Sequence, residues 1–232
     1  MIEAVLRPPV QAAEAFADDP VVLFPEELAV VATASQRRRR EFATARGCAH
    51  AALARLGLPP AAILPDRAGA PVWPKGVVGS ITHCSGYRAA AVAPAGQVAA
   101  VGLDAEPNRP LRTDGMLDVI ARQPERARLA GLAALVPDVC WDKLLFSAKE
   151  AVYKAWYPLA RSWLGFKAAD VVFDPDGGTF TARLLVPGPP VGGSPLTTLS
   201  GRWLAGRGLL LAAVVIPARG YQQVRLPAVA TA

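Results

Sequence analysis

The chain has 232 residues, of which 52% are hydrophobic, so it can bury one large core or two small ones and is not expected to be disordered. Its net charge of +6 indicates anionic partners, a class that includes nucleic acids, acidic proteins and phosphorylated small molecules. The longest uncharged apolar run, 208–216, is far shorter than the ~20 residues that span a bilayer, and no signal peptide is evident. We therefore expect a cytoplasmic protein with no membrane partner.

The cysteines and histidines exclude two classes of site. Cys48, Cys84 and Cys140 are odd in number, widely spaced and contain no CxxC pair, which argues against a disulfide framework and against a zinc site. His50 and His83 are the only histidines, so a histidine-rich metal centre is not expected either.

The predicted elements run from helix to antiparallel strands twice. Residues 35–57 read as an amphipathic helix that begins at the N-cap Ser35 and stops at Gly57. A loop rich in proline and glycine follows, and then come three predicted strands, at 77–83, 87–93 and 97–106. These segments predict a first helix-and-sheet unit.

The second unit follows a break at 107–110, which is the best candidate for a linker. A polar helical stretch near 114–134 precedes a stronger helix from about Val139, which Pro158 must end or kink. Strands are predicted at 170–173, 179–186, 199–204 and 209–216, with a surface loop at 186–195. The chain is thus predicted to be α+β, with two similar subdomains at 1–106 and 107–232.

Two carboxylates lie on one predicted strand. Because side chains alternate along a strand, Asp104 and Glu106 share a face, while Leu103 and Ala105 point the other way. On its own, this pair is more typical of a strand end that emerges into solvent.

A third carboxylate changes that interpretation. On the helix after Val139, Glu150 lies one turn before Lys154 and next to Lys149. Such a pattern alone is often an ordinary ion pair, but this helix is largely apolar, so its charges lie at the rim of a packed surface. Three carboxylates beside lysines favour a hard cation next to a phosphate, with Mg²⁺ and a phosphorylated ligand as the simplest occupants.

Small and hydroxyl residues surround one histidine in 79–86. Backbone amides together with Thr82 and His83 could bind a phosphate, although a simple turn between strands is an equal alternative. A Cys84–His83 nucleophile is disfavoured, since neighbours on an extended chain point to opposite faces.

A run of four arginines, 37–40, spreads around its helix, so most of them are expected to be solvated. Arg46 is the better candidate for a directed phosphate contact, because it shares a flank of the helix with Arg39 and His50. No exposed aromatic pattern accompanies the arginines, so we expect no nucleic-acid partner.

At these residues the chain resembles the 4′-phosphopantetheinyl transferase superfamily, in its larger single-chain form, the surfactin-synthetase and enterobactin-synthetase type. The resemblance covers roughly 37–186, in five ordered blocks: Arg46-Gly-Cys-Ala-His, Trp73-Pro-Lys-Gly-Val-Val-Gly-Ser, Gly79-Ser-Ile-Thr82-His83-Cys, Val-Gly-Leu-Asp104-Ala-Glu106 and Phe146-Ser-Ala-Lys149-Glu150-Ala-Val-Tyr-Lys154-Ala-Trp-Tyr-Pro. It implies an intramolecular pseudo-dimer with the active site between its halves, and therefore favours a monomer.

The resemblance also implies the reaction and its residues. Such enzymes transfer the phosphopantetheine arm of coenzyme A to a serine of an apo acyl or peptidyl carrier protein, use Mg²⁺ and release 3′,5′-adenosine bisphosphate. By position, Asp104, Glu106 and Glu150 match the metal ligands. The expected catalytic residues are Glu150, Lys154 and His83, and the expected coenzyme contacts are Arg46, Lys75, Thr82, His83, Lys149 and Lys154. That Glu150 serves as the base, directly or through a metal-bound water, is our own hypothesis, since it would bridge the metal and the open side of the cleft.

The chain departs from the family pattern at two positions, and the acceptor is not fixed by the sequence. Ala70 stands where the family often has a basic residue, so Arg67 or Lys75 would have to replace it, and His50 stands where arginine is common. An acidic carrier would suit the basic chain, and four aromatic residues could help to dock it or could belong to the core: Tyr153, Trp156, Tyr157 and Trp163. The pathway of the acceptor is undetermined among fatty-acid, polyketide and nonribosomal-peptide or siderophore synthesis.

Two other functions compete with transfer. One is a Mg²⁺-dependent hydrolase of a nucleotide pyrophosphate, which would need no carrier. The other is a non-catalytic coenzyme A sensor, against which the complete set of carboxylates argues.

Overall fold

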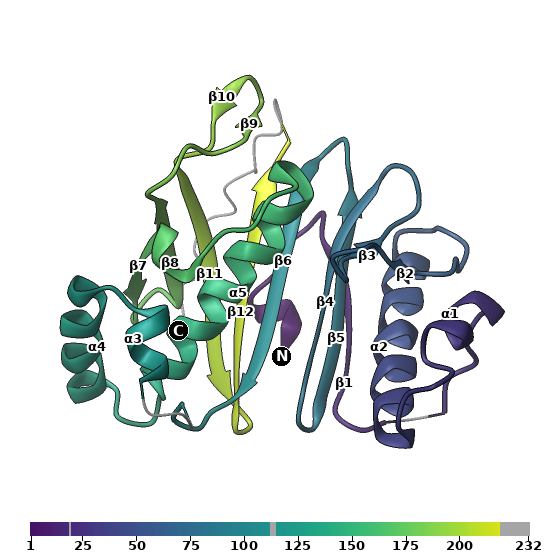
Figure 1. Ribbon diagram of the computed structural model, residues 1–232, viewed down its shortest axis with the longest axis horizontal. Helices are drawn as coiled ribbons and strands as arrows, with labels where there is room; N and C mark the ends of the chain where they lie inside the picture. The colour runs from purple at the N-terminus through teal and green to yellow at the C-terminus, as the bar shows by residue number, and fades with distance from the viewer. Residues whose placement is uncertain (19, 112–114, 219–232) are drawn as a thin grey trace, which may run out of the picture.

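The computed structural model describes residues 1–18, 20–111 and 115–218, which build four layers in the order helix, sheet, sheet, helix (Figure 1). The N-terminal half of the molecule comprises the elements from the start of the chain to Pro94. The C-terminal half begins with the strand at Val98 and ends at Pro217. Each half contributes one sheet and one long covering helix, which confirms the α+β prediction.

The N-terminal half is a three-stranded antiparallel sheet. Its order is β1 (Gln11–Ala15), β5 (Tyr87–Pro94), β4 (Val77–Cys84). Helix α2 (Gln36–Arg55) covers its outer face, where Ala49, Ala52 and Leu53 pack against Ala90 and Val92 of β5. The Ser35 hydroxyl accepts a hydrogen bond from the Arg38 amide and caps this helix, as the sequence predicts.

The C-terminal half is a five-stranded antiparallel sheet covered by α5 (Trp141–Ala160). Its strands, in spatial order, are β6 (Val98–Pro107), β12 (Leu209–Pro217), β11 (Thr198–Gly206), β8 (Thr179–Leu184) and β7 (Ala169–Asp174). The Pro158 ring is accommodated in the last turn of α5, which ends two residues later with Arg161 in the left-handed region (φ 50°).

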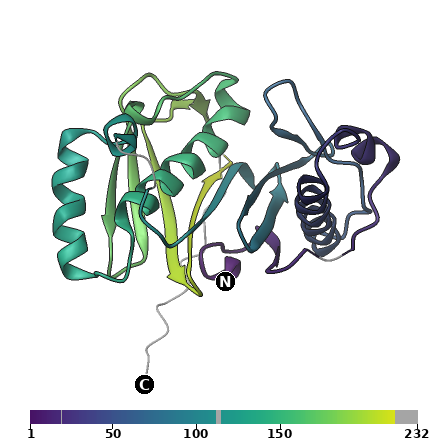
Figure 2. The same cartoon turned by 60° about the horizontal axis from the view of Figure 1, so that its bottom comes forward.

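Short elements complete the fold. They are η1 (Ile2–Ala4), α1 (Pro25–Val30), β2 (Leu64–Pro65), β3 (Pro71–Val72), α3 (Met116–Ile120), α4 (Gln123–Leu135), η2 (Phe166–Ala168), β9 (Pro190–Val191) and β10 (Ser194–Pro195). In Figure 2, α4 lies at the edge opposite to α2, so the two halves lie side by side along the long axis. No helix in these described ranges is both long and apolar enough to cross a membrane.

The seam between the two sheets is apolar. Tyr87 and Ala89 of β5 point into it from one sheet, and Val101, Leu103 and Ala105 of β6 point into it from the other. The outer edge of β6 carries backbone amides that no strand pairs. Hydroxyls from β4 accept from them instead: the Leu103 amide donates to Ser80 Oγ and the Ala105 amide to Thr82 Oγ1, each at 3.0 Å.

Most predicted elements are present, with three differences. The stretch predicted as one helix at 114–134 is two helices, α3 and α4, separated at Ala121 and Arg122; Asp114 lies outside the described residues. The predicted loops after α2 and at 186–195 each contain a two-residue ladder, β2–β3 and β9–β10. The sequence did not predict β1 or α1.

The predicted boundary at residue 106 divides the chain one strand later than the hydrogen bonding does. Strand β6 pairs along its length with β12, so it belongs to the C-terminal sheet. The predicted linker 107–110 is anchored rather than free, since the Asn108 side chain donates to Asp138 O at 2.7 Å and accepts from the Cys140 amide at 2.9 Å.

Candidate active site

The predicted acidic face of β6 points at α5. Val101, Leu103 and Ala105 fill the seam, so the alternate residues face the covering helix. Among them is Gly102, whose lack of a side chain lets the helix approach: a Cβ there would lie 1.9 Å from Ala151 O. Asp104 and Glu106 follow on the same face, where the helix passes next to the strand.

Two lysines of α5 contact these acids. Lys154 Nζ lies 2.7 Å from Asp104 Oδ1 and 3.0 Å from Leu103 O, while Lys143 Nζ lies 3.5 Å from Glu106 Oε2. The helix therefore brings ammonium groups to both carboxylates of the strand, and the structure supports the predicted meeting of 104–106 with Lys154.

Glu150 belongs to the same cluster. Its pKa is raised, first by burial and next by the negative charge of Asp104, with a smaller contribution from Glu106 and an opposing one from Lys154. The pKa of Glu106 is also raised, by burial and by Asp104, against the lowering effect of Lys143. Three carboxylates thus repel one another in a partly buried place.

The donor set suits a hard cation. Asp104 Oδ2 is buried and has no hydrogen-bond partner among the described residues. Carboxylate oxygens beside a phosphate are the ligands that Mg²⁺ prefers, usually one or two of them together with waters. Within the described ranges, however, no group of three His, Cys, Asp or Glu side chains is arranged as a ready-made metal cage, so the predicted metal ligands stay a prediction.

A cavity of about 470 Å³ opens beside this cluster. Glu150 and Lys154 line it from the C-terminal half, and Ser80 and Ile81 of β4 line it from the N-terminal half. It therefore lies between the halves, next to the carboxylates, and has room for a sizeable ligand.

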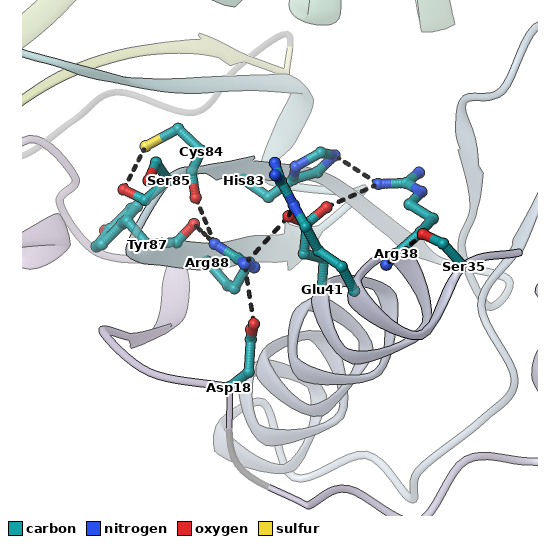
Figure 3. Close-up of polar contacts among 10 residues, drawn as sticks. Asp18, Ser35, Arg38, Glu41, His83, Cys84, Ser85, Tyr87 and Arg88 are labelled. Carbon is teal, nitrogen blue, oxygen red and sulfur yellow. Dashed lines mark hydrogen bonds and ion pairs between the residues drawn. The ribbon is translucent and has the colours of Figure 1, made fainter.

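His83 lies at the end of β4, where it is paired with Arg88 of β5 (Figure 3). Its Nε2 lies 3.0 Å from Arg38 Nη1 of α2. Because arginine can only donate, Nε2 accepts and the neutral ring carries its proton on Nδ1. The pKa of His83 is lowered, by partial desolvation first and by the charge of Arg38 second.

The buried side chain of Arg88 holds together the chain segments around His83. Arg88 Nη2 lies 3.1 Å from Asp18 Oδ2 and 3.6 Å from Glu41 Oε1, and its Nη1 donates to the carbonyl of Tyr87 (Figure 3). Glu41 in turn lies 3.9 Å from Arg38. Burial raises the pKa of the neighbouring Cys84 thiol to about 12, which favours the protonated thiol and argues further against a Cys-His nucleophile.

Sequence reasoning missed Arg38, which it treated as one of four solvated arginines. The available signal was the position of Arg38 just after the N-cap, but the sequence did not show that this end of α2 lies against β4.

Lys149 does not lie with the cluster. Its ammonium is buried on another side of α5, where it donates to Glu125 Oε2, Ile120 O and Phe166 O, each at 2.8 Å. With its side chain only 1% exposed, Lys149 joins α5 to α3, α4 and η2, and the predicted coenzyme contact is not supported.

Three further predicted contacts are placed differently from expectation. Thr82 is buried outside the cavity lining, where its hydroxyl accepts from the Ala105 amide and lies 3.5 Å from Asp104 Oδ1, beside the carboxylates. Arg46 is buried as well: its Nε donates to Ile63 O at 2.7 Å, its guanidinium lies 4.1 Å from the Phe42 ring centre, and burial lowers its pKa to about 10. Lys75 is exposed in the turn before β4 and does not line the cavity.

The aromatic residues of this region divide between core and surface. Trp156 is buried and its indole donates to Ser162 O, whereas Trp163 is 69% exposed and lies 4.7 Å from the Tyr153 ring.

Comparison with known proteins identifies the family. A model of the 4′-phosphopantetheinyl transferase N-terminal domain matches residues 25–93, and one of the 4′-phosphopantetheinyl transferase superfamily matches 100–190. The chain belongs to the 4′-phosphopantetheinyl transferase superfamily. The two matches meet between 93 and 100, where the N-terminal sheet ends and β6 begins.

Curated relatives of the transferase extend over most of its length. It is 61% identical to the 4′-phosphopantetheinyl transferase Svp of Streptomyces mobaraensis, across 87% of this chain and 82% of Svp. It is 46% identical to PptT of Mycobacterium tuberculosis, across 88% and 91%, and 45% identical to Npt of Nocardia iowensis, across 92% and 99%. The predicted family and enzyme class are confirmed.

Proposed function

We propose that the enzyme transfers the phosphopantetheine arm of coenzyme A to a serine hydroxyl of an apo carrier protein, with Mg²⁺, and releases 3′,5′-adenosine bisphosphate. The observation that carries the proposal is the junction of three carboxylates and Lys154 beside a cavity between the two halves.

The chain's own residues suit this reaction. Asp104, Glu106 and Glu150 would hold Mg²⁺, which when bound neutralises pyrophosphate charge. Lys154, which lies beside Asp104, would stabilise the charge that develops on the leaving phosphate. His83, with its proton on Nδ1 and its Nε2 held by Arg38, can donate a hydrogen bond to a phosphate oxygen.

Glu150 is the proposed base for the attacking serine. Its raised pKa brings its proton affinity closer to that of a working general base, and it lines the cavity. We expect Glu150→Gln to lower kcat by roughly 100-fold or more, while Glu3→Gln, a change at an exposed carboxylate, leaves kcat unchanged. Near-normal transfer by Glu150→Gln would remove this role.

The reaction is tested by incubating the enzyme with coenzyme A, Mg²⁺ and a panel of apo carrier proteins, read by intact mass. A gain equal to the phosphopantetheine arm on some carriers supports the proposal and shows the acceptor class. Adenosine bisphosphate released without carrier would favour a hydrolase, and binding of coenzyme A with no product would favour a sensor. Loss of transfer on chelation of Mg²⁺, or in Asp104→Asn, tests the metal ligands.

The net charge indicates the kind of carrier protein that the enzyme would bind. With a net charge of +6, the enzyme is suited to an acidic carrier, so we expect the KM for the carrier to rise with salt. A monomer with both halves in one chain and a cytoplasmic location complete the proposal.

A further inference from the structure

The loop between β2 and β3 is tightened by one aspartate. Asp66 Oδ1 accepts from the amides of Ala68 and Ala70, each at 2.9 Å, and the Asp66 amide donates to Ala70 O at 2.8 Å. Beyond this turn, Leu64 pairs with Val72 and closes the loop. One carboxylate oxygen of Asp66 is therefore used within the loop itself.

The other oxygen of Asp66 reaches the C-terminal half. Asp66 Oδ2 accepts from the Tyr157 hydroxyl at 3.2 Å and lies 3.5 Å from Arg161 Nη1. Both partners come from the C-terminal end of α5, and the Arg161 guanidinium lies 5.7 Å from the Tyr157 ring centre. Three side chains thus join two segments that are more than ninety residues apart.

This junction lies on the wall of the cavity beside the carboxylates. Gly69, Ala70 and Pro71 line the cavity from the loop, and Tyr157 and Arg161 line it from the helix that also carries Glu150 and Lys154. The loop has only a two-residue ladder of its own, so its position over the cavity depends on contacts with other elements.

We propose that Asp66, Tyr157 and Arg161 form a latch that positions the β2–β3 loop as a wall of the coenzyme-binding cavity. The inference rests on the proposed function, because it takes coenzyme A as the ligand of that cavity. The latch residues act by holding the loop in place, so their removal weakens coenzyme binding while the chemistry at Glu150 and Lys154 continues once coenzyme is bound.

Removal of one oxygen tests the latch. Tyr157→Phe keeps the ring and deletes the hydroxyl that bonds Asp66. We expect the Kd and the KM for coenzyme A to rise roughly 3- to 10-fold, the range for one solvent-accessible hydrogen bond, with kcat unchanged. Asp66→Asn keeps an oxygen for the turn and removes the charge that Arg161 contacts, so it should give a similar rise in the Kd for coenzyme A. Because the two residues share one contact, Tyr157→Phe combined with Asp66→Asn should raise the Kd by less than the product of the two single effects.

A matched control is available in the other half. Asp174 tightens the β7–β8 turn in the same manner, since its Oδ1 accepts from the Gly177 amide at 3.1 Å, but it lies outside the cavity lining. Asp174→Asn should therefore leave the Kd for coenzyme A unchanged. This control distinguishes loss of the latch from a general effect of loosening an aspartate-capped turn elsewhere in the protein.

Hydrogen exchange gives a second measurement that does not depend on turnover. In Tyr157→Phe the amides of Ala68 and Ala70 should exchange faster than in the wild type, while the amides of β12 should not change. An unchanged Kd for coenzyme A in Tyr157→Phe overturns the proposal, whether or not the loop exchanges faster. Failure of the proposed function would show separately, as a wild type that binds coenzyme A and modifies no carrier.

Discussion

At the scale of single residues, acidic and basic side chains alternate around His83. Glu41 lies between Arg37 at 3.0 Å, Arg88 at 3.6 Å and Arg38 at 3.9 Å, so it offsets repulsion among cations near the histidine. Its own pKa is lowered, chiefly by the hydrogen bond from Arg37. Glu41 therefore allows several arginines to lie close together near His83.

The titration of His83 follows from this arrangement. Desolvation and the charges of Arg38, Lys154 and Arg88 hold its pKa below the usual 6.5, against the opposite effect of Glu41. Arg38→Ala should raise the midpoint towards 6.5, because it removes the nearest cation and opens the ring to water. Histidine NMR would follow the titration, with the signal assigned through its absence from His83→Gln.

The adjacent arginine provides the control. Arg37 is 85% exposed on the side chain and is not among the main charges that shift the pKa of His83, so Arg37→Ala should leave the titration midpoint of His83 nearly in place. An unchanged midpoint in Arg38→Ala would contradict the pairing. Because the folded pKa is depressed, the unfolded state binds the proton more readily, and stability from this group declines as the pH falls from about 6.5 through the folded pKa.

Residue patterns predicted the acidic cluster but not where the neighbouring side chains lie. Asp104, Glu106 and Lys154 follow from the periods of a strand and a helix, which fix faces. Those periods do not say what lies opposite each face. Lys149 is buried because Glu125 and the carbonyls of Ile120 and Phe166 come to it from other elements, and nothing in its own helix signals that.

At the scale of elements, the approach of α5 to β6 depends on Gly102. An added methyl group would lie 1.9 Å from Ala151 O and 2.8 Å from the Ala155 amide nitrogen, both of them backbone atoms that cannot turn aside. The helix would have to move away from the strand that carries Asp104.

Gly102→Ala should therefore lower the free energy of unfolding by about 3 kcal/mol or more, at or beyond the upper end for overpacked sites. Urea unfolding measures the loss, and transfer activity should fall with it. Gly131→Ala is the control, since Gly131 lies in α4 with open space around it and should gain about 1 kcal/mol from helix propensity. Equal stabilities for the two variants would refute the close approach.

The elements that the sequence predicted are those with strong patterns. Helix α2 and strands β4 to β6 carry regular apolar periods and clear stop signals, and they appear within a few residues of the expected positions. Strand β1 was missed because Gln-Ala-Ala-Glu-Ala has little strand propensity, and its pairing with β5 decides its state. Helix α1 was missed because it has only six residues.

At the scale of the whole molecule, two buried glutamates occupy matching places. Glu27 accepts from the Phe24 amide at the start of α1, from the Ile63 amide before β2, and contacts His50 of α2. Glu125 accepts from the Arg122 amide at the start of α4, from the Val171 amide in β7, and from Lys149 of α5. This correspondence supports the predicted similarity of the two halves, which the local sequences do not reveal.

The buried ion pair of Lys149 and Glu125 should contribute strongly to the stability of the C-terminal half. Lys149→Met would leave the Glu125 carboxylate without its ammonium partner and should cost about 3–5 kcal/mol in urea unfolding, whereas Lys149→Met with Glu125→Gln should recover part of that loss. Asp118→Asn, in an exposed pair with Arg126, should cost less than about 1 kcal/mol. A loss for Lys149→Met as small as that control would contradict the role of the buried pair.

Strand β6 has a consequence for how ligands reach the cavity. One edge of β6 is joined to β12 along its length, and the other is fastened by the hydroxyls of Ser80 and Thr82. The two halves therefore cannot separate at this seam without breaking the hydrogen bonds from the Leu103 and Ala105 amides to those hydroxyls. We therefore expect coenzyme to reach the cavity along its open rim, and any movement needed for entry to come from short lining segments such as the β2–β3 loop.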